Sequence, residues 1–294
     1  MNYAVIVTYN RLSLLKECII AIQNQTKKLD KVIIVNNGST DGTTNWLNDQ
    51  IDLHVINQEN TGGAGGFHTG VKFAYENGAD WIWLMDDDVK PEENCLQELL
   101  KYRNISKCLH PVRDFSDNVN YLWGEYLDLK HYKKHTLSGI EINNKEIYFI
   151  NVGCFEGMLI NSEIISKIGF PDSRFFISGD DTIYGYLANQ FTNVCCIKSA
   201  RMIRAKKSGD LSVSPMYLYY AYRNFHLYEE YYYNFRNKHF SFKVKMNHLI
   251  NGILVIFKLI IKNYTFSQKI KITNAIIKGI IHSKQKKINN SFKQ

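Results

Sequence analysis

The sequence predicts an α/β protein with a mixed, mainly parallel sheet and flanking helices, followed by a basic helical C-terminal region. Over the first 100 residues, short apolar segments alternate with segments of helical periodicity, which is typical of parallel strands joined by right-handed crossovers. The 294 residues are 45% hydrophobic and 22% charged, with 18 Gly and 4 Pro, and this composition excludes collagen-like, disordered and low-complexity chains. The charge is segregated, because residues 231–294 hold 13 basic side chains and no acidic ones.

The first half of the predicted fold consists of four strands and three helices. Apolar, β-branched runs predict strands at residues 3–8, 31–35, 53–56 and 81–85. Apolar side chains at helical spacing predict a helix over 14–22, and Ser39, Thr40 or Asp41 can cap a second helix that ends near Leu47. Residues 62–66 are expected to form a glycine-rich loop before a third helix at 69–77.

The remaining chain changes character twice. Residues 101–150 alternate aromatic and polar side chains, which indicates an antiparallel insertion or a sheet edge. From Tyr217 onward the chain is rich in tyrosine and is expected to be helical. We therefore predict a domain at 1–215, with halves at 1–100 and 101–215, and a helical tail at 216–294. The longest apolar stretch, 249–261, is too short to span a bilayer.

Cysteine usage and the N-terminal segment indicate a cytosolic protein. The six cysteines form no Cys-x-x-Cys pair and show no regular spacing, so we expect reduced thiols rather than disulfides or a zinc site. The first ten residues lead directly into a strand and contain neither the basic nor the apolar region of a secretory signal.

The strongest chemical signal is the run Asp86-Asp87-Asp88 at the end of the fourth predicted strand. Ligands of open α/β sheets bind outside the carboxyl ends of strands, and carboxylates there can hold a divalent cation that bridges phosphates. Because alternate residues of an extended turn point the same way, Asp86 and Asp88 are the expected metal pair. The alternative is a solvated acidic loop with a helix cap before Pro91.

Two further segments are weaker candidates. Residues 60–66 contain four glycines, which would let backbone N–H groups approach a phosphate or a sugar, although a plain flexible turn is equally consistent. Asp180 and Asp181 follow an aromatic run, and apolar surroundings can raise a carboxyl pKa toward the range of a general base. The alternative for this pair is a helix N-cap.

In combination these segments resemble glycosyltransferase family 2, inverting enzymes of the GT-A fold. The similarity rests on residues 7–11, 36–43, 59–66 and 86–88, whose order and spacing cover about residues 1–100, with 153–186 as the acceptor half. The triple Asp, the loop at 59–66 and the segment after Asp181 are most similar to the bacterial galactofuranosyl- and rhamnosyltransferase branch. The resemblance implies a UDP-galactofuranose or dTDP-rhamnose type of donor and a glycan or lipid-linked acceptor.

The resemblance also implies roles for individual residues. Asp86 and Asp88 would hold Mn²⁺ or Mg²⁺ across the donor diphosphate, with Asp87 beside the donor sugar. Asp181 would be the general base, with Asp180 as its neighbour and the second candidate for that role. The other donor contacts implied are Thr8, Tyr9, Asn10 and Arg11 around the nucleotide, Asn36 and Asn37 at the base or ribose, and Gly65 and Gly66 against the sugar-phosphate. Trp123 is a weaker candidate for stacking on a sugar, whereas Trp83 is expected in the core.

One departure from the family pattern concerns the metal site. Relatives often place a metal-binding histidine about twenty residues after the base, and residues 200–208 contain none. Either Asp86, Asp88 and phosphate oxygens hold the ion alone, or Arg204, Lys206 or Lys207 supplies positive charge to the diphosphate. An exposed basic loop is an equal alternative for these three residues.

The basic tail has an apolar pattern of its own. Leu249, Ile253, Ile256, Phe257 and Ile260 fall on one helical stripe, and Ile272, Ile276, Ile277 and Ile280 repeat the pattern. With 13 positive charges and no acid, the tail is expected to lie on an anionic membrane, which places the protein peripherally on the inner face of the plasma membrane. Helix packing in a homo-oligomer is the competing interpretation, and nucleic-acid binding is disfavoured because no recognition fold accompanies the charge.

Two functional hypotheses follow. The first is an inverting, metal-dependent glycosyltransferase that builds a cell-surface polysaccharide. The second is a non-catalytic member of the same fold that binds a nucleotide sugar or scaffolds a membrane assembly. The missing histidine favours the second, and the acidic pairs favour the first.

Overall fold

The computed structural model describes residues 1–119, 126–136, 145–208, 214–261 and 264–288, without the side chains of 259–261. The chain divides into two compact units. Unit 1 comprises Met1–Tyr126, His135–Ser173 and Asp180–Leu211, and unit 2 comprises Leu127–Lys134, Arg174–Gly179 and Ser212–Gln294.

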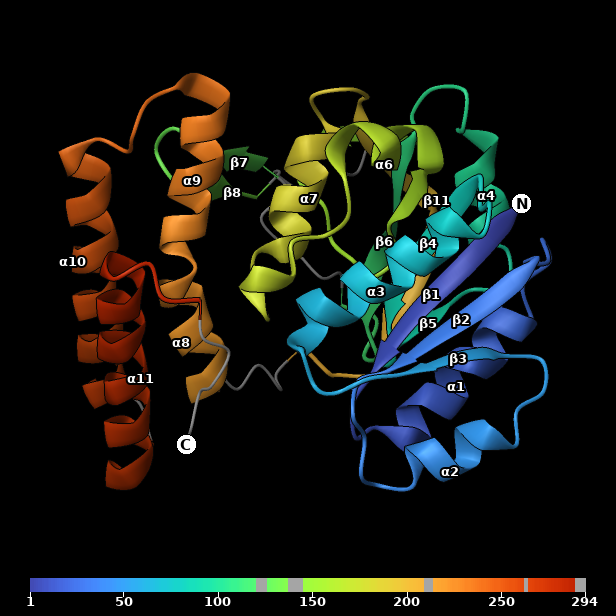
Figure 1. Cartoon of the computed structure of the whole chain (residues 1–294), viewed down its shortest axis with the longest axis horizontal. Helices are drawn as coiled ribbons and strands as arrows, with labels where there is room; N and C mark the ends of the chain where they lie inside the picture. The colour runs from blue at the N-terminus through green and yellow to red at the C-terminus, as the bar shows by residue number, and fades with distance from the viewer. Residues whose placement is uncertain (120–125, 137–144, 209–213, 262–263, 289–294) are drawn as a thin grey trace. The chain divides into compact units, whose positions relative to one another are not determined.

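Unit 1 is an α/β layer structure (Figure 1). Its strands are β1 (Asn2–Thr8), β2 (Lys31–Asn36), β3 (His54–Asn57), β4 (Trp81–Asp86), β5 (Val89–Pro91), β6 (Cys108–Phe115), β9 (Ile147–Ile150), β10 (Leu159–Asn161) and β11 (Val194–Arg204). Its helices are α1 (Leu12–Gln23), α2 (Thr43–Asn48), α3 (Gly62–Glu76), α4 (Cys95–Lys101), α6 (Ser162–Ile168) and α7 (Asp180–Ala188). The expected mixed, mainly parallel sheet with flanking helices is confirmed.

The sheet follows the order β3-β2-β1-β4-β10-β6-β11-β5, with β9 paired to β11. Strands β3, β2, β1 and β4 are parallel neighbours, as are β6 and β11, while β10, β5 and β9 run antiparallel to their partners. The sequence-based expectation of a sheet edge over 101–150 is therefore correct for β9 and wrong for β6, which lies inside the sheet.

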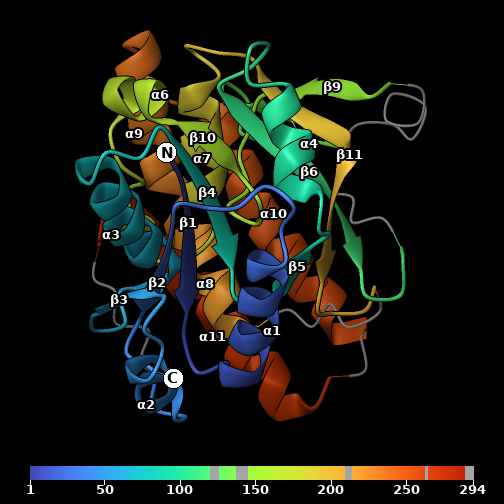
Figure 2. The ribbon, with the colours of Figure 1, turned by 90° about the vertical axis from the view of Figure 1, so that its right-hand side faces the viewer.

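Both faces of this sheet are covered, because alternate side chains of each strand enter different clusters. Val5, Ile33 and Leu84 pack with α3, α6 and α7, whereas Ile6 and Ile34 pack with α1, α2 and α4. Figure 2 shows α3 and α6 on one side of the strands and α1 and α4 on the other. A strand that is covered on both faces reads as a continuous apolar run, which is why these strands were recognisable in the sequence.

The glycine-rich segment is part of a helix rather than a loop. Helix α3 begins at Gly62, so residues 62–66 form its first turn, and the expectation of a separate loop is corrected. A Cβ on Gly66 would lie 2.4 Å from Val7 Cγ1, and one on Gly70 would lie 2.3 Å from Val5 Cγ1. Glycine at these positions lets α3 pack closely on β1.

Unit 2 consists of helices with a short hairpin. The helices are α8 (Pro215–Arg223), α9 (Phe225–Arg236), α10 (Phe242–Ile261) and α11 (Phe266–Lys284), and the hairpin is β7 (Tyr126–Asp128) with β8 (Lys133–His135), whose outer ends belong to unit 1. Leu218, Tyr222, Ile272 and Ile276 form an internal cluster that joins α8 to α11. None of the helices among the described residues is both long and apolar enough to cross a bilayer.

This packing corrects the expected outward stripe on the last helix. Ile272 and Ile276 are buried and Ile280 packs against the same cluster, whereas Ile277 is 46% exposed. On α10, Ile253 and Phe257 are exposed, and Ile256 packs partly inward. Two apolar faces are present on these helices, and the sequence alone did not distinguish the internal face from the external one.

Candidate active site

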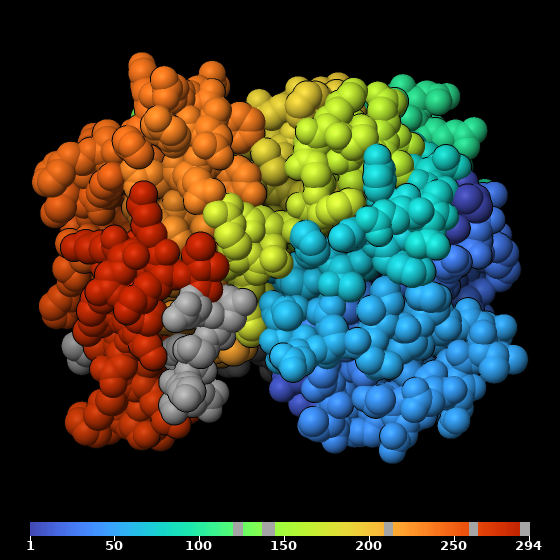
Figure 3. Space-filling view, in the orientation of Figure 1, coloured from blue at the N-terminus to red at the C-terminus, as the bar shows by residue number. Residues whose placement is uncertain are grey.

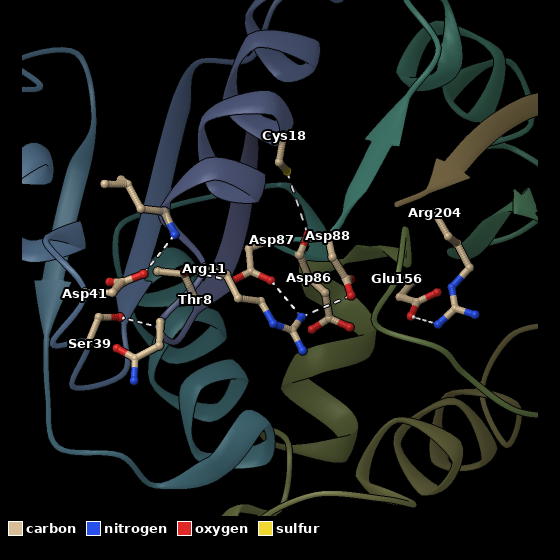
Figure 4. Close-up of polar contacts among 12 residues, drawn as sticks. Thr8, Arg11, Cys18, Ser39, Asp41, Asp86, Asp87, Asp88, Glu156 and Arg204 are labelled. Carbon is tan, nitrogen blue, oxygen red and sulfur yellow. Dashed lines mark hydrogen bonds and ion pairs between the residues drawn. The ribbon is translucent and has the colours of Figure 1, made fainter. Parts of the chain in front are cut away.

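Three carboxylates converge at the carboxyl end of β4. Asp86 is the last residue of that strand, and Asp88 follows in the turn to β5. Glu156 reaches them from the segment before β10, and the ligand oxygens of Asp86, Asp88 and Glu156 all lie within 4.8 Å of one another. Figure 4 shows the three side chains together, with Arg11 on one side and Arg204 on the other. The structure thus brings the two expected metal ligands together and adds a third carboxylate.

Asp87 points away from this cluster toward β1. Thr8 Oγ1 donates to Asp87 Oδ2 at 2.7 Å, and Arg11 Nη1 donates to Asp87 Oδ1 at 3.1 Å. The same Arg11 nitrogen donates to Asp88 Oδ2 at 3.0 Å. Arg11 therefore joins two members of the acidic run, so the segment expected to bind the nucleotide lies beside that run.

Glu156 was not predicted, and backbone contacts explain its position. Gly157 N donates to Leu84 O at 2.8 Å, and Trp83 Nε1 donates to Gly157 O at 3.1 Å, so this segment is fixed against the strand that ends at Asp86. Gly157 has a φ of +102°, and a Cβ there would lie 2.5 Å from Pro111 Cγ. A single carboxylate followed by glycine in an apolar segment was the signal available in the sequence.

The local charges oppose ionisation of the cluster. Burial raises the pKa of Asp86 well above its usual range, and repulsion from Asp88, Glu156 and Asp87 adds to the increase, while Arg11 opposes it. Burial also raises the pKa of Asp87, and both Arg11 and the hydrogen bond from Thr8 counteract that effect. A cation bound among these carboxylates would relieve their repulsion.

Of the three predicted basic residues, Arg204 belongs to the cluster. Arg204 Nη2 lies 2.9 Å from Glu156 Oε1, and its side chain is 12% exposed. Arg113 Nη1 lies 3.8 Å from Glu156 Oε2. Ala205 N donates to Asp88 O at 2.8 Å, so the segment in which a metal-binding histidine was expected runs directly beside the acidic turn. Lys206 and Lys207 are exposed.

The second acidic pair begins helix α7. Asp180 is buried, and Asp181 is half-buried, with its Oδ1 accepting a hydrogen bond from Thr182 N at 2.6 Å. Burial raises the pKa of the Cys154 thiol; Arg113 lowers it, and the charges of Glu156 and Asp181 raise it further. Glu156 and Asp181 thus act on the same thiol, which indicates that Asp181 lies near the segment that carries Glu156.

The N-terminus of α7 also packs directly on that segment. A Cβ on Gly153 would lie 2.7 Å from Asp181 O and 3.0 Å from Gly185 N. A Cβ on Gly185 would lie 1.8 Å from Gly153 N. Two glycines therefore allow the helix that carries Asp181 and the segment that carries Glu156 to meet with their backbones in contact.

Asn36 and Asn37, the residues expected at the base or ribose, are buried and hydrogen-bonded within the chain. Both are 2% exposed. Asn36 Nδ2 donates to Thr44 Oγ1 and Asn57 Oδ1, each at 2.8 Å. Asn37 Nδ2 donates to Gly62 O at 3.0 Å, and its Oδ1 accepts from Thr61 N at 3.2 Å. These amides connect the ends of the strands to the next helices, and the contact with a base or ribose stays a prediction.

The remaining predicted donor residues have different surroundings. Tyr9 is 45% exposed at the end of β1, and Asn10 N donates to Ser39 Oγ at 3.0 Å. Gly65 and Gly66 are buried, and a Cβ on Gly65 would lie 2.2 Å from Thr61 Oγ1. Both glycines have a packing role in the structure, and their contact with a sugar-phosphate stays a prediction. Trp123 lies outside the described residues.

This arrangement suits a hard divalent cation and an anionic ligand. Three carboxylates supply oxygen ligands of the kind that Mg²⁺ and Mn²⁺ prefer. Arg11 reduces the repulsion that raises the pKa of Asp86, but it does not cancel it. The cluster lies at the carboxyl end of a parallel strand, where α/β sheets bind their ligands. Fold and site together define an α/β protein with an acidic ligand site at the carboxyl end of a parallel strand.

Comparison with known proteins identifies the class. The model of glycosyl transferase family 2 matches residues 3–169, which is more than half of the sequence, and the chain belongs to this family. The galactofuranosyltransferase GlfT1 of Mycolicibacterium smegmatis is 27% identical over 186 residues, which cover 60% of this chain and 62% of that protein. The protein of the same name from Mycobacterium tuberculosis is 29% identical over 188 residues, or 61% of each chain. The chain thus spans about three fifths of the length of these relatives.

Solved structures agree on the fold. The structure of GalNAc-T7 with UDP, GalNAc and Mn²⁺ has a TM-score of 0.60 and 15% identity, and covers 81% of this chain and 51% of that one. The structure of S. aureus TarS 1–349 with UDP has a TM-score of 0.56 and 13% identity, and covers 78% of this chain and 65% of that one. At these identities the similarity shows the GT-A fold alone. The predicted resemblance to the galactofuranosyltransferase branch is confirmed by the relatives.

Proposed function

We propose that this chain transfers a galactofuranosyl group from a UDP-linked donor to a hydroxyl group of a glycan or lipid-linked acceptor, with inversion at the anomeric carbon. The observation that carries the proposal is the convergence of Asp86, Asp88 and Glu156 near the helix that carries Asp181. The sugar is suggested by the galactofuranosyltransferase relatives, and the nucleotide by neighbours solved with UDP. A dTDP-rhamnose type of donor is the alternative that the binding experiment below distinguishes.

The carboxylate cluster is proposed to hold Mn²⁺ or Mg²⁺. When bound, the ion supplies positive charge to the diphosphate that leaves the sugar. Arg11 and Arg204 hold Asp88 and Glu156 from opposite sides, so the carboxylates are positioned before any ligand arrives. In this proposal Glu156 provides the third protein ligand, the role for which the family resemblance led us to expect a histidine.

Asp181 is proposed to be the general base. It takes the proton of the acceptor hydroxyl as that oxygen forms the new bond to the anomeric carbon, and the bond from this carbon to the diphosphate oxygen breaks. One base and one leaving group on opposite faces of the sugar suffice, so no covalent intermediate is needed. The contact between α7 and the segment from Gly153 to Glu156 would hold base and metal site in a fixed relation.

A second candidate function is a non-catalytic nucleotide-sugar-binding protein of the same fold. It is favoured by the arginines, because Arg11 and Arg204 already place positive charge beside the cluster. Such a protein could bind a diphosphate without a metal ion and without turnover.

The substitution Asp181→Asn separates the two functions. If Asp181 is the base, release of UDP should fall at least about 100-fold while donor binding is retained, because general-base catalysis contributes factors of this size. Asp52→Asn makes the same chemical change at an exposed carboxyl group and should keep the parental rate. Equal UDP release by parent and Asp181→Asn would contradict the assignment of the base.

Metal and donor binding are tested without turnover. Manganese titration followed by electron paramagnetic resonance should give an affinity lowered roughly tenfold or more in Glu156→Gln, because the charge count of the ligands sets the affinity. Glu93→Gln, at an exposed site, is the matched control. A thermal-shift panel of nucleotide sugars, with Mn²⁺ and with chelator, then identifies the donor. Stabilisation that ignores the metal would favour the arginine-based alternative.

A further inference from the structure

Helix α10 of unit 2 has an inward face that is fully accounted for by packing. Val244 and His248 are buried on this face, and a Cβ on Gly252 would lie 2.9 Å from Ile280 Cδ1 and 3.2 Å from Tyr222 Cε1. Val255 packs against the cluster that joins α8 and α11. These positions recur at intervals of three or four residues and form one side of the helix.

The same helix carries a second apolar face that is open to solvent. Ile250, Ile253, Leu254 and Phe257 are 44%, 44%, 50% and 60% exposed, and their spacing places them on one side, away from the packed face. Phe242, which is 79% exposed, extends this side by two turns. A soluble helix normally exposes polar residues opposite its buried stripe, so five large apolar side chains here require an explanation.

Helix α11 repeats this arrangement. Phe266, Ile270, Ile277 and Ile281 are 80%, 45%, 46% and 46% exposed at intervals of four and seven residues. Its inward face is separate and consists of Ile272, Ala275 and Ile276. Figure 3 shows side chains of α10 and α11 at the molecular surface. Two successive helices therefore each expose an apolar stripe in addition to the stripe that they bury.

The charged residues around these apolar stripes indicate which kind of partner can bind there. Lys243 and Lys258 are exposed on α10, and residues 231–294 carry 13 basic side chains without one acid. A second copy docked through the same faces would bring two strongly positive surfaces together, which is unfavourable. An acidic protein or nucleic acid would satisfy the lysines but leave the isoleucines and phenylalanines without apolar contact. An anionic bilayer satisfies both, since its headgroups attract lysine and its acyl boundary takes up apolar side chains.

We propose that the outward faces of α10 and α11 dock onto the surface of an anionic phospholipid membrane. The helices lie in the interface with Phe257 and its neighbours inserted among the acyl chains and the lysines at headgroup level. This inference goes beyond sugar transfer and does not depend on it, because it concerns unit 2 and its lipid partner alone.

Co-sedimentation of the full chain with vesicles tests the proposal in the absence of donor and metal. The chain should pellet with vesicles of phosphatidylcholine and phosphatidylglycerol, pellet less with phosphatidylcholine alone, and be released partly by salt. The double variant Leu254→Gln/Phe257→Gln should lower the partition coefficient at least about tenfold. The reason is that the exposed apolar surface of these two side chains, about half of each, would no longer be transferred from water into the membrane. Ile20→Gln/Ile51→Gln, at exposed apolar positions of unit 1, should bind as the parent does.

Two further measurements keep the result decisive. The fluorescence of the tryptophan introduced by Phe257→Trp should be quenched by brominated phosphatidylglycerol. The fluorescence of the tryptophan introduced by Phe191→Trp, at an exposed site of unit 1, should not be quenched. Lys243→Gln/Lys258→Gln should weaken binding at low salt more than Lys27→Gln/Lys28→Gln does. Equal pelleting by the Leu254/Phe257 variant and the parent would overturn the proposal. So would the absence of vesicle binding together with a parent oligomer that this variant dissociates, which would identify a second copy as the occupant.

Discussion

A methyl group added to Gly185 tests whether α7 and the Glu156 segment are held at a fixed distance. The added Cβ of Gly185→Ala would lie 1.8 Å from Gly153 N, 2.3 Å from Gly153 Cα and 2.3 Å from Val152 C. All three atoms belong to backbone, so no flexible side chain can move aside. Reaching an ordinary contact of 3.4 Å requires the two segments to separate by about 1.6 Å.

The expected cost follows from this displacement. Overpacking of a well-packed interior costs about 1–3 kcal/mol, and the better helix propensity of alanine returns at most about 1 kcal/mol. Since only backbone atoms are in the way, the upper end of this cost applies, and we expect the free energy of unfolding to fall by about 2 kcal/mol. Because displacements of about 1 Å at a reacting centre cost about 100-fold in rate, turnover should fall by at least this factor.

Urea unfolding and UDP release measure the two effects. Gly63→Ala is the matched control, since Gly63 is also helical and an added Cβ meets nothing within 4 Å. The control should be as stable as the parent or slightly more stable. If Gly185→Ala unfolds at the same urea concentration as Gly63→Ala and keeps its rate, the close backbone contact does not position the site.

Two predictions concern other parts of the fold. Trp83→Phe should lower the free energy of unfolding by roughly 2–4 kcal/mol in urea titrations, because Gly157 O loses its indole donor and a cavity forms beside β4. The control Trp46→Phe, at a half-buried position, should lower it clearly less. Equal losses in the two variants would contradict the role of the hydrogen bond. Burial lowers the pKa of His248 from 6.5 to about 4, so the unfolded chain takes up a proton before the folded one and unit 2 loses stability as the pH falls from 6.5 to about 4. The loss of stability amounts to about 3 kcal/mol, at 1.36 kcal/mol per pKa unit. His248→Gln should remove this loss from the pH dependence of unfolding. If parent and variant have the same pH dependence, burial does not lower the pKa of His248.

The elements that the sequence predicted well are those covered on both faces. Strands β1, β2 and β4 are apolar runs that end in polar residues, and their ends located the acidic run at Asp86 correctly. Strand β6 lies in the segment that was interpreted as an insertion or sheet edge, and its Pro111 is a residue that argues against a strand inside a sheet. The structure accommodates it at an irregularity, since the register with β11 shifts between Ile197, opposite Pro111, and Arg201.

The site was harder to predict than the strands because contacts decide which polar groups face a ligand. Asn37 follows a strand as a ligand-binding residue would, yet its amide is used by Gly62 O and Thr61 N. Glu156 shows no periodic signal and owes its position to backbone hydrogen bonds that its neighbour makes with β4. On α10 both faces are apolar, so hydrophobicity alone could not tell the packed face from the open one.

The strand order has a consequence for synthesis of the protein on the ribosome. Strands β3, β2, β1 and β4 pair with near neighbours in the sequence, so this half of the sheet can form early during elongation. The other neighbour of β4 is β10, and β6 pairs with β11, which emerges after every other strand of the described residues. The acidic residues of β4 therefore leave the ribosome well before Glu156, Asp181 and Arg204. A nascent chain can hold a folded nucleotide-side half while its reaction centre is incomplete, and its uncovered strand edge needs protection during that interval.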